Sequence, residues 1–355
     1  MNNKFKLLPE WALQEAVILA WPDENTDWQP WLHQVRAVYI EIIRTLNLAD
    51  TAVILLVRQS AIEPCKSLIP KDAKVLLVDA DYNDTWLRDY GFLSVSDGNL
   101  VTPIEFIFNG WGEKFDANND NAINKYALQQ LCQSDIRSID LVLEGGAIEI
   151  DGNGHLLSTA LCLQNSKRNG DKSLIDYQHD FASYLGATTS TILKHGHLEG
   201  DDTDGHIDTL VRFTPSNGLV IQTAFNRLDD PHFKALEDLK LECNARLPKH
   251  QIFELPLPYI VNSEGQRLPA SYANYLISNQ QILCPIYQQP EDELAINTIK
   301  NAYPNFTIVA INCLPLVQQF GSLHCITMQV PEGVLKPEVL QSLKNGVFLY
   351  ESTQA

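Results

Sequence analysis

Short apolar runs and segments of helical periodicity alternate along the first part of the chain. Residues 16–21, 52–57 and 74–78 are continuous apolar runs, a pattern typical of strands that are buried on both faces. Between the first two runs, from residue 28 to residue 48, apolar side chains recur at helical spacing. Pro30 suits the first turn of that helix, where a backbone N–H would have no helical partner. The pattern predicts strand, helix, strand and strand, in that order.

Beyond residue 89, a unit of hairpin, helix and strand recurs along the chain. Turn-forming residues such as Asp97-Gly98-Asn99 separate paired apolar segments, as hairpins require. The predicted hairpins are 90–106, 146–160, 206–223 and 272–286, and residues 322–329 are predicted to be the first strand of a fifth. The predicted helices are 121–132, 175–185, 232–246 and 291–302, followed by short strands at 140–143, 189–193, 251–255 and 307–311.

Five such units predict an α/β fold with a closed, radially repeated architecture, in which the hairpin ends face a central axis. Two unrelated α/β domains are the alternative that periodicity alone leaves open. The ring is favoured because polar motifs recur at the same place in each unit, with anchors at positions 89, 144, 206, 274 and 325. No linker or shift in composition divides the chain, so residues 1–355 are predicted to form one domain.

Charge and composition narrow the classes of function. The chain has 26 basic and 44 acidic side chains, a formal net charge of −18, which argues against a nucleic-acid-binding protein. A negative field is compatible with a small cationic substrate, because it raises the rate of encounter, although simple solubility explains the charge as well. The expected partner is therefore a small cationic molecule; the sequence leaves the oligomeric state open, a homo-oligomer included.

Cysteine usage and apolar run lengths bear on the compartment. Seven cysteines are an odd number, and no two form a C-x-x-C pair, which is typical of free thiols in a reducing compartment. The segment Met1–Lys6 leads into polar residues without an apolar signal region, and the apolar runs are far too short to span a bilayer. We expect a soluble, cytoplasmic protein without a membrane partner.

A cysteine in the apolar run 323–327 is the first candidate for chemistry. Cys325 lies in what should be a strand, where a cysteine is most often a packing residue. Its importance rises because Asp89, Glu144 and His206 lie at the equivalent place in other units. A thiol, a histidine and carboxylates are the groups needed for covalent attack on a cationic carbon.

The spacing of His206 and Asp208 adds a geometric expectation. Two residues apart on a strand, they should share one face, either as a buried ion pair or in a cavity. In a cavity, Asp208 and Asp89 could hold a planar guanidinium between them. Glu144 follows an apolar run, and a carboxylate there can orient a histidine and keep it protonated.

Metal and cofactor sites are not expected. The acidic loop 200–205 does not fit an EF-hand, because the twelfth position would be Val211 rather than a bidentate acid. No histidine pair has zinc-ligand spacing with cysteines, no glycine-rich phosphate loop follows a strand, and no serine nucleophile elbow occurs.

Seven short motifs, which cover nearly the whole chain in order, carry a resemblance to a known family. They are Trp21-Pro22, Asp84-Thr85-Trp86-Leu87-Arg88-Asp89, Phe108-Asn109-Gly110-Trp111-Gly112, Leu143-Glu144-Gly145-Gly146, Asp202-Thr203-Asp204-Gly205-His206-Ile207-Asp208, Ala270-Ser271-Tyr272-Ala273-Asn274-Tyr275 and His324-Cys325-Ile326-Thr327. Together they resemble the guanidine-modifying enzymes, and within them the agmatine deiminases, with the bacterial peptidylarginine deiminases close by. That resemblance implies a five-bladed, pseudo-symmetric α/β propeller that needs no cofactor.

The resemblance also implies roles for individual residues. It implies Cys325 as nucleophile, His206 as general acid and base, Glu144 as its partner, and Asp89 with Asp208 as the guanidinium clamp. Trp86 is expected to flank the alkyl chain of the substrate; the expected pocket wall and amine end comprise Asp84, Asp202 and Trp111. The implied reaction converts agmatine to N-carbamoylputrescine and ammonia, through a thiouronium linked to the cysteine, in polyamine (putrescine) biosynthesis.

One segment departs from the family pattern, and three other functions stay open. Where agmatine deiminases carry a glycine-rich run, residues 318–323 read Gln-Gln-Phe-Gly-Ser-Leu, and Phe320 is expected to narrow or reshape the entrance.

The first alternative is another reaction at the same site, either amidino transfer or deimination of free or peptidyl arginine. The second is a guanidine- or polyamine-binding protein without catalysis, and the third is a structural propeller with an incidental cysteine.

Overall fold

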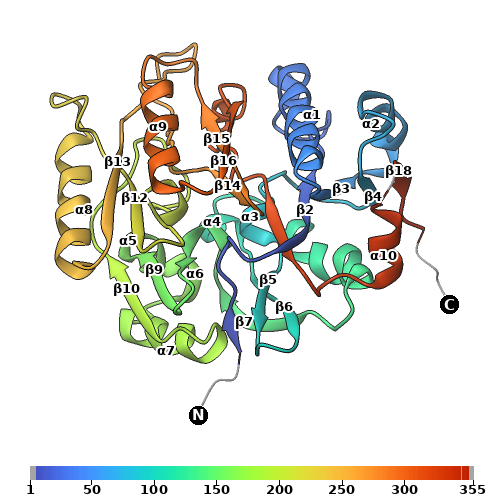
Figure 1. The fold of residues 1–355 in the computed structure, drawn as a ribbon, viewed down its shortest axis with the longest axis horizontal. Helices are drawn as coiled ribbons and strands as arrows, with labels where there is room; N and C mark the ends of the chain where they lie inside the picture. Colours follow the sequence, from blue (N-terminus) through green and yellow to red (C-terminus); the bar gives the residue numbers. More distant parts are fainter. Residues whose placement is uncertain (1–4, 345, 352–355) are drawn as a thin grey trace.

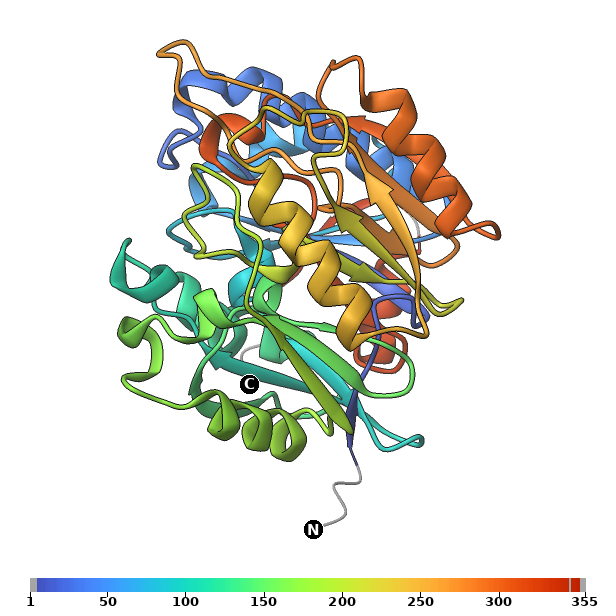
Figure 2. The same ribbon diagram turned by 90° about the vertical axis from the view of Figure 1, so that its left-hand side faces the viewer.

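The computed structural model describes residues 5–344 and 346–351 and shows a mixed α/β fold (Figures 1 and 2). The expected α/β class is confirmed, whereas the expectation about the start of the chain rests partly on residues 1–4, which lie outside the described residues. Among the described residues, no helix is long and apolar enough to cross a membrane.

Within the described ranges, the strands form five sheets. The first, in the order β1-β5-β6-β7, comprises β1 (Lys6–Leu7), β5 (Leu93–Ser96), β6 (Val101–Ile107) and β7 (Arg137–Val142). The next two comprise β8 (Glu149–Ile150), β9 (His155–Thr159) and β10 (Thr189–Leu193), then β11 (Val211–Phe213), β12 (Gly218–Gln222) and β13 (Gln251–Leu255). The fourth comprises β14 (Leu276–Ser278), β15 (Gln281–Ile286) and β16 (Thr307–Asn312).

The fifth sheet joins the two ends of the chain. Its order is β17-β2-β3-β4-β18, from β2 (Gln14–Ala20), β3 (Ala52–Val57), β4 (Val75–Asp79), β17 (Met328–Pro331) and β18 (Val347–Leu349). Each of the other four sheets has an antiparallel pair followed by a parallel strand, and β17, β2 and β3 repeat that pattern. The C-terminal β17 thus pairs with the N-terminal β2, a link that the sequence analysis did not make (Figure 1).

Helices connect the strands within these units. The longer ones are α1 (Leu32–Leu48), α2 (Ile62–Leu68), α7 (Leu174–Tyr184), α8 (Phe233–Arg246), α9 (Asp292–Ala302) and α10 (Pro337–Ser342). Four single turns are α3 (Leu87–Tyr90), α4 (Gly110–Glu113), α5 (Ala160–Leu163) and α6 (Ser166–Asn169). Helix α8 lies on the outer side of the molecule, in front in Figure 2, and buries only its inner face.

The helix expected at 121–132 is instead a series of 3₁₀ and π turns, Asp120–Ala122, Asn124–Leu128 and Gln129–Leu131. Side chains at its start are committed to neighbouring loops. Asp120 accepts a hydrogen bond from the backbone N–H of Asn83 at 2.6 Å, and Asn121 accepts one from Phe108 at 2.8 Å. These side-chain bonds to backbone N–H groups of other segments compete with a regular helix, and Asp120 is buried by them while Asn121 stays exposed.

Five predicted strands begin later than expected. Those expected from residues 146 and 272 begin at Glu149 and Leu276, and the first residues of the other three form turns. The strands expected from residues 90, 206 and 322 begin at Leu93, Val211 and Met328. The preceding residues lie in α3, in a 3₁₀ turn (Ile207–Thr209) and in a turn over 323–326. The argument that His206 and Asp208 share the face of a strand was therefore wrong. Neither lies in a strand, because the backbone must bend where polar side chains converge.

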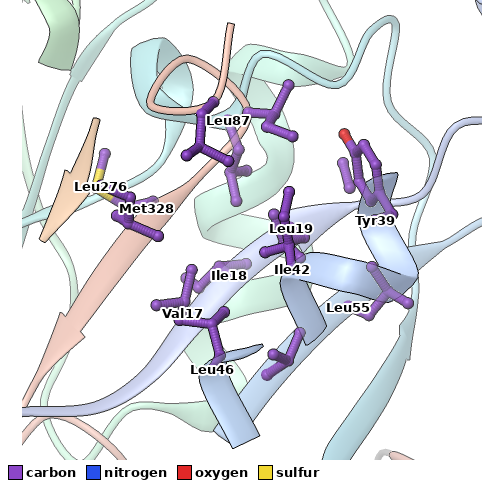
Figure 3. Close-up of a cluster of buried hydrophobic side chains, with 14 of the residues drawn as sticks. Val17, Ile18, Leu19, Tyr39, Ile42, Leu46, Leu55, Leu87, Leu276 and Met328 are labelled. Atoms are coloured by element: carbon purple, nitrogen blue, oxygen red, sulfur yellow. The ribbon is translucent and has the colours of Figure 1, made fainter. Parts of the chain in front are cut away.

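The largest hydrophobic cluster surrounds strands β2, β3 and β4. All six residues of β3 are buried, and α1 packs against that strand through one side (Figure 3). Leu46 on α1 is fully buried in the cluster, near Val17 and Ile18 of β2 in the same figure. Leu48, two residues further along the helix, is 88% exposed. The helix therefore carries one apolar face, as its spacing in the sequence predicts.

Two substitutions in α1 test this packing with the same chemical change. Leu46→Ala should lower the free energy of unfolding by roughly 2–5 kcal/mol, because it leaves a cavity in the core. Leu48→Ala should change it by no more than about 0.5 kcal/mol, because that side chain is in solvent. Denaturant unfolding of both variants measures the difference. Equal effects would contradict the assigned face of the helix.

Candidate active site

A cavity of about 350 Å³ opens where the loops and turns of several units meet. Its walls include eight of the nine residues singled out in the sequence: Asp84, Trp86, Asp89, Trp111, Asp202, His206, Asp208 and Cys325. The ninth, Glu144, is fully buried and does not line the cavity. The sequence therefore located the residues of the cavity more accurately than it located the strands that were expected to carry them.

Cys325 presents a free thiol to the cavity from a turn rather than from a strand. Its Sγ lies 3.4 Å from Asn274 Oδ1, and its carbonyl accepts the N–H of Arg88 at 3.1 Å. Burial raises the pKa of this thiol well above its ordinary value, and the nearby carboxylates of Asp208 and Asp89 raise it further. These surroundings therefore favour the neutral form of the thiol.

Asp208 offers one free carboxylate oxygen. Its Oδ2 lies 2.7 Å from His324 Nδ1 and accepts a bond of 3.3 Å from Asn274 Nδ2. Its buried Oδ1 has no hydrogen-bond partner within the described part of the chain. Burial opposes the charge, but the hydrogen bond and the charge of His324 hold the pKa of Asp208 below its ordinary value. An ionised, buried oxygen without a donor is a strong site for a cationic N–H.

Asp89 has partners on both of its oxygens. Oδ1 accepts the N–H of Gly146 at 3.0 Å and lies 3.6 Å from His206 Nδ1, while Oδ2 accepts the indole N–H of Trp111 at 2.9 Å. Burial raises the pKa of Asp89; His206 lowers it and Asp208 raises it. Trp111, expected to contribute to the pocket wall and the amine end, thus lines the cavity beside Asp89.

Gly146 is required by a close approach of side chains. A Cβ at this position would lie 2.6 Å from His206 Nδ1, 2.9 Å from Asp89 Oδ1 and 3.2 Å from Asp208 Oδ2. Any larger residue would push apart the histidine and the two carboxylates. Gly146 therefore serves the packing of polar side chains around the cavity, while Gly145 allows the close approach of the Arg88 carbonyl.

His206 is buried between negative groups. Burial alone would lower its pKa, but Asp89, Cys162 and Glu144 outweigh it and raise the pKa to about 10. Its Nε2 has no hydrogen-bond partner among the described residues. At neutral pH the ring is therefore an imidazolium that can give a proton to a ligand in the cavity.

Glu144 is held behind His206 by a cation that the sequence did not reveal. Arg168 donates its Nε–H to Glu144 Oε1 at 2.7 Å, and both side chains are buried. The donor atoms of Glu144, Cys162 and His206 lie within 4.8 Å of one another, close enough to hold a metal ion. Sequence reasoning had no signal for this cluster, because Cys162 lies in an unremarkable apolar turn and has no histidine at ligand spacing.

The other end of the cavity is acidic. Burial raises the pKa of Asp84 to about 6 and that of Asp120 to about 8. Partial burial of its carboxylate also raises the pKa of Asp202, although the residue as a whole is exposed. Asp84 Oδ2 accepts the indole N–H of Trp86 at 3.0 Å, so this carboxylate and this ring are fixed together. Within the described part of the chain, no lysine or arginine lines the cavity.

Phe320 and Gly321 shape the wall beside Trp86. Phe320 lines the cavity with a left-handed backbone, φ 62°, which is unusual for an aromatic residue. A Cβ at Gly321 would lie 2.2 Å from the ring of Trp86. The segment that departs from the family pattern therefore does form part of the cavity.

Four further residues complete the site beyond those given roles from the sequence. Asn274 and His324 stood within the motifs that carry the family resemblance, but their contacts with Asp208 could not be read from the motifs. Arg168 and Cys162 stood outside every motif that was noticed. Asn274 and His324 reach Asp208 from other units, whereas Arg168 meets Glu144 within one unit through a loop that no motif marked.

Comparisons with known proteins identify relatives of this chain over most of its length. A family model described as Porphyromonas-type peptidyl-arginine deiminase matches residues 6–331. A protein of Shewanella frigidimarina named "Putative agmatine deiminase" is 30% identical, with 94% of this chain and 95% of that protein covered. Two solved structures, each covering 94% of this chain, have TM-scores of 0.85. One is C. jejuni agmatine deiminase, a cysteine-to-serine variant with substrate bound (30% identical, 97% covered); the other is described as "Putative Arginine Deiminase" from Porphyromonas gingivalis (35% identical, 100% covered).

The match of the family model to most of the chain, together with full-length relatives at 30% identity or more, establishes the family. The protein belongs to the Porphyromonas-type peptidyl-arginine deiminase family, has agmatine deiminases among its relatives, and is a hydrolase that acts on carbon–nitrogen bonds of linear amidines.

Proposed function

We propose that the protein hydrolyses a guanidine by deimination, and that agmatine is converted to N-carbamoylputrescine and ammonia. One observation supports this most directly. The free thiol of Cys325 shares a cavity with the unpartnered oxygen of Asp208, with Asp89 and with the imidazolium of His206, and no basic residue of the described chain lines the acidic far end. Such a cavity suits a dication with a guanidinium at one end and an amine at the other.

Binding begins with the guanidinium. Asp208 Oδ1 accepts one N–H, and Asp89 supplies the second negative charge, so the planar cation is fixed with its central carbon toward Cys325. The amine end meets Asp84 and its neighbours, and the alkyl chain lies along Trp86. Phe320 narrows the same wall, which favours a slender alkyl chain over a bulky one.

The chemistry then follows in two halves. The thiolate of Cys325 attacks the guanidinium carbon and forms a tetrahedral adduct; His206 donates a proton to the departing nitrogen, the carbon–nitrogen bond breaks and ammonia leaves. The remaining thiouronium is attacked by water, whose proton passes to His206. The carbon–sulfur bond then breaks, which releases the ureido product and restores the thiolate.

Ionisation of the thiol depends on the substrate. In the empty site, burial and the two carboxylates raise the pKa of Cys325. A guanidinium bound to Asp89 and Asp208 neutralises their charge and places a cation beside the sulfur, which lowers the pKa of the thiol. The bound substrate thus assists in forming its own nucleophile.

Substrate choice separates agmatine from the alternatives. Free arginine would bring an α-carboxylate into an acidic cavity, and no lysine or arginine of the described chain is present there to pair with it. The names of the relatives include both agmatine and arginine deiminases, so the argument for agmatine rests on the lining of this cavity. A binding protein without catalysis is less well supported, because binding needs neither the thiol nor the imidazolium.

We further infer that the five sheets are the blades of a pseudo-symmetric α/β propeller in a single domain. Support comes from the repeated order of an antiparallel pair and a parallel strand, and from the pairing of β17 with β2, which joins the ends of the chain. The product would serve reactions that form putrescine, and the free thiols are consistent with a reducing, cytoplasmic setting.

Replacing the nucleophile tests the reaction. Cys325→Ser should abolish release of ammonia from agmatine, because a serine hydroxyl in this site is far harder to ionise, while agmatine should still bind. Ammonia is measured enzymatically, and the ureido product of the wild type is identified by mass spectrometry. Cys65→Ala, which removes a buried thiol outside the cavity, should keep activity. Undiminished turnover in Cys325→Ser would disprove the assignment.

The contribution of protonated His206 to the free energy of unfolding should decrease as pH rises. With its pKa raised from 6.5 to about 10, its contribution to stability is fully present below pH 6.5 and is lost as pH rises through about 10. Its NMR titration should therefore have a midpoint near 10, and Asp89→Asn should lower it. His155, whose pKa burial lowers, provides an internal control that should not respond. A midpoint near 6.5 in the wild type would contradict the ion pair.

The amine end can be tested with paired substrates. Asp84→Asn keeps an oxygen for the Trp86 N–H but removes the charge, so KM for agmatine should rise roughly tenfold. Butylguanidine has the guanidinium and the alkyl chain but no amine, and its kinetics should barely change. An equal effect on both substrates would place the amine elsewhere.

A further inference from the structure

A chain of side chains with alternating charge leads from the cavity to the N-terminal segment, and all but Glu10, whose side chain is 18% exposed, are buried. His324 Nδ1 lies 2.7 Å from Asp208 Oδ2, and His324 Nε2 lies 2.7 Å from Glu10 Oε1. Glu10 Oε2 accepts a bond of 2.5 Å from Arg212, which also donates to Glu149 at 2.9 Å. Glu10 and His324 are 314 positions apart in the sequence, so only the fold brings them together.

The His324 ring is fixed from both sides. Ionised carboxylates can only accept hydrogen bonds, so the ring must donate from both nitrogens to satisfy Asp208 and Glu10. Its backbone N–H donates to Asn274 Oδ1 at 2.9 Å, and only 1% of the residue is exposed. The imidazole therefore has one position available, and it cannot reach the cavity as an acid or base.

This arrangement determines which oxygen Asp208 presents. His324 and Asn274 both bind Oδ2, and Oδ1 is left buried without a partner in the described structure. Rotation of the carboxylate would break both bonds. The bonds on one oxygen thus leave the other free for the donor of a ligand, in a fixed direction.

Glu10 is itself held by several donors. Arg88 lies 3.3 Å from its Oε1, and Gln329 Nε2 donates to Oε2 at 3.0 Å, in addition to the bond from Arg212. Burial would raise the pKa of Glu10, but Arg212, His324 and Arg88 hold it well below its ordinary value. Glu10 therefore remains a carboxylate and supports the far nitrogen of His324.

We propose that His324 and Glu10 are positioning residues for the guanidinium clamp, which act through Asp208 without touching the substrate. The proposal rests on the proposed function only in taking a cationic amidine or guanidine as the ligand of Asp208. Without His324, the carboxylate would turn and lose a cationic partner, so the clamp would hold its ligand less well.

The groups that face Asp208 determine the expected pH dependence. His324, His206 and Arg212 favour its ionised form, whereas Asp89 and the buried surroundings disfavour it, and the Cys325 thiol lies alongside. Removing His324 takes away both a hydrogen bond and a positive charge. Loss of the clamp on acidification should then occur at higher pH than in the wild type.

Alkylation of Cys325 by two related reagents provides the test. Thiolate sulfur attacks the CH₂ carbon of 2-chloroacetamidine or of 2-chloroacetamide, a carbon–sulfur bond forms and chloride leaves. The amidine is a cation that the clamp can hold, while the amide is neutral. The ratio of the two rate constants, from mass spectrometry of the peptide containing Cys325, therefore reports the clamp and not the general reactivity of the thiol.

In His324→Gln the ratio of the rate constant for the amidine to that for the amide should fall roughly tenfold. The pH at which half of this ratio is lost on acidification should rise by about one unit. Glu10→Gln keeps the size of the side chain and one acceptor. It should therefore lower the ratio and raise the midpoint pH by smaller amounts than His324→Gln. Thermal unfolding is measured in parallel, and Glu10→Gln decides the question if His324→Gln does not fold. His155→Gln, at a half-buried histidine bonded to Thr191 outside the cavity, should leave the ratio unchanged.

Each outcome distinguishes the inference from its alternatives. If both reagents slow by the same factor in a folded variant, that residue has a structural role only and the assignment is wrong. A wild type that prefers the amidine but releases no ammonia from agmatine would contradict the proposed reaction and leave the positioning role measurable. A wild type with no preference for the amidine would contradict the clamp itself.

Discussion

The buried charge of Arg212 is the constraint on which the centre of the molecule depends. Its guanidinium is fully buried, and it donates to Glu10, to Glu149 and to the carbonyls of Ala273 and Tyr275. A buried cation that lost one of its carboxylates would cost several kcal/mol, roughly 3–5 by analogy with other buried pairs. The segments that carry these partners are far apart in sequence, so satisfying one side chain fixes several units relative to one another.

The same requirement shapes the cavity. Charges alternate from Arg212 through Glu10 and His324 to Asp208, so each buried ion has an opposite neighbour until the last carboxylate, one of whose oxygens faces no donor. Among the carboxylates of the described chain that line the cavity, Asp208 alone has a buried oxygen without a hydrogen-bond partner, and such an oxygen is a binding site for a cation. Stability of the centre and affinity for the ligand therefore have a common physical origin.

The sequence was informative about order and poor about long-range pairing. Apolar runs and turn residues placed β3, β10, β13 and β15 at their observed bounds, because these strands are regular, and β3 and β15 are also almost wholly buried. The starts of β5, β8, β11, β14 and β17 were wrong. At β11 the reason is that polar residues such as His206 impose a turn that a strand pattern conceals. The contact of Glu10 with His324 left no periodic signal at all, and neither did that of Glu144 with Arg168.

Two aromatic residues with left-handed backbones show where local strain is concentrated. Trp111 has φ 57° and Phe320 has φ 62°, and both line the cavity. Bulky residues in this region cost of order 1–3 kcal/mol, so they persist only where other contacts outweigh the strain. Trp111 gains the bond to Asp89, and Phe320 packs against the main hydrophobic cluster. At Phe320 a glycine would relieve the strain but would leave the cavity wall beside Trp86 open.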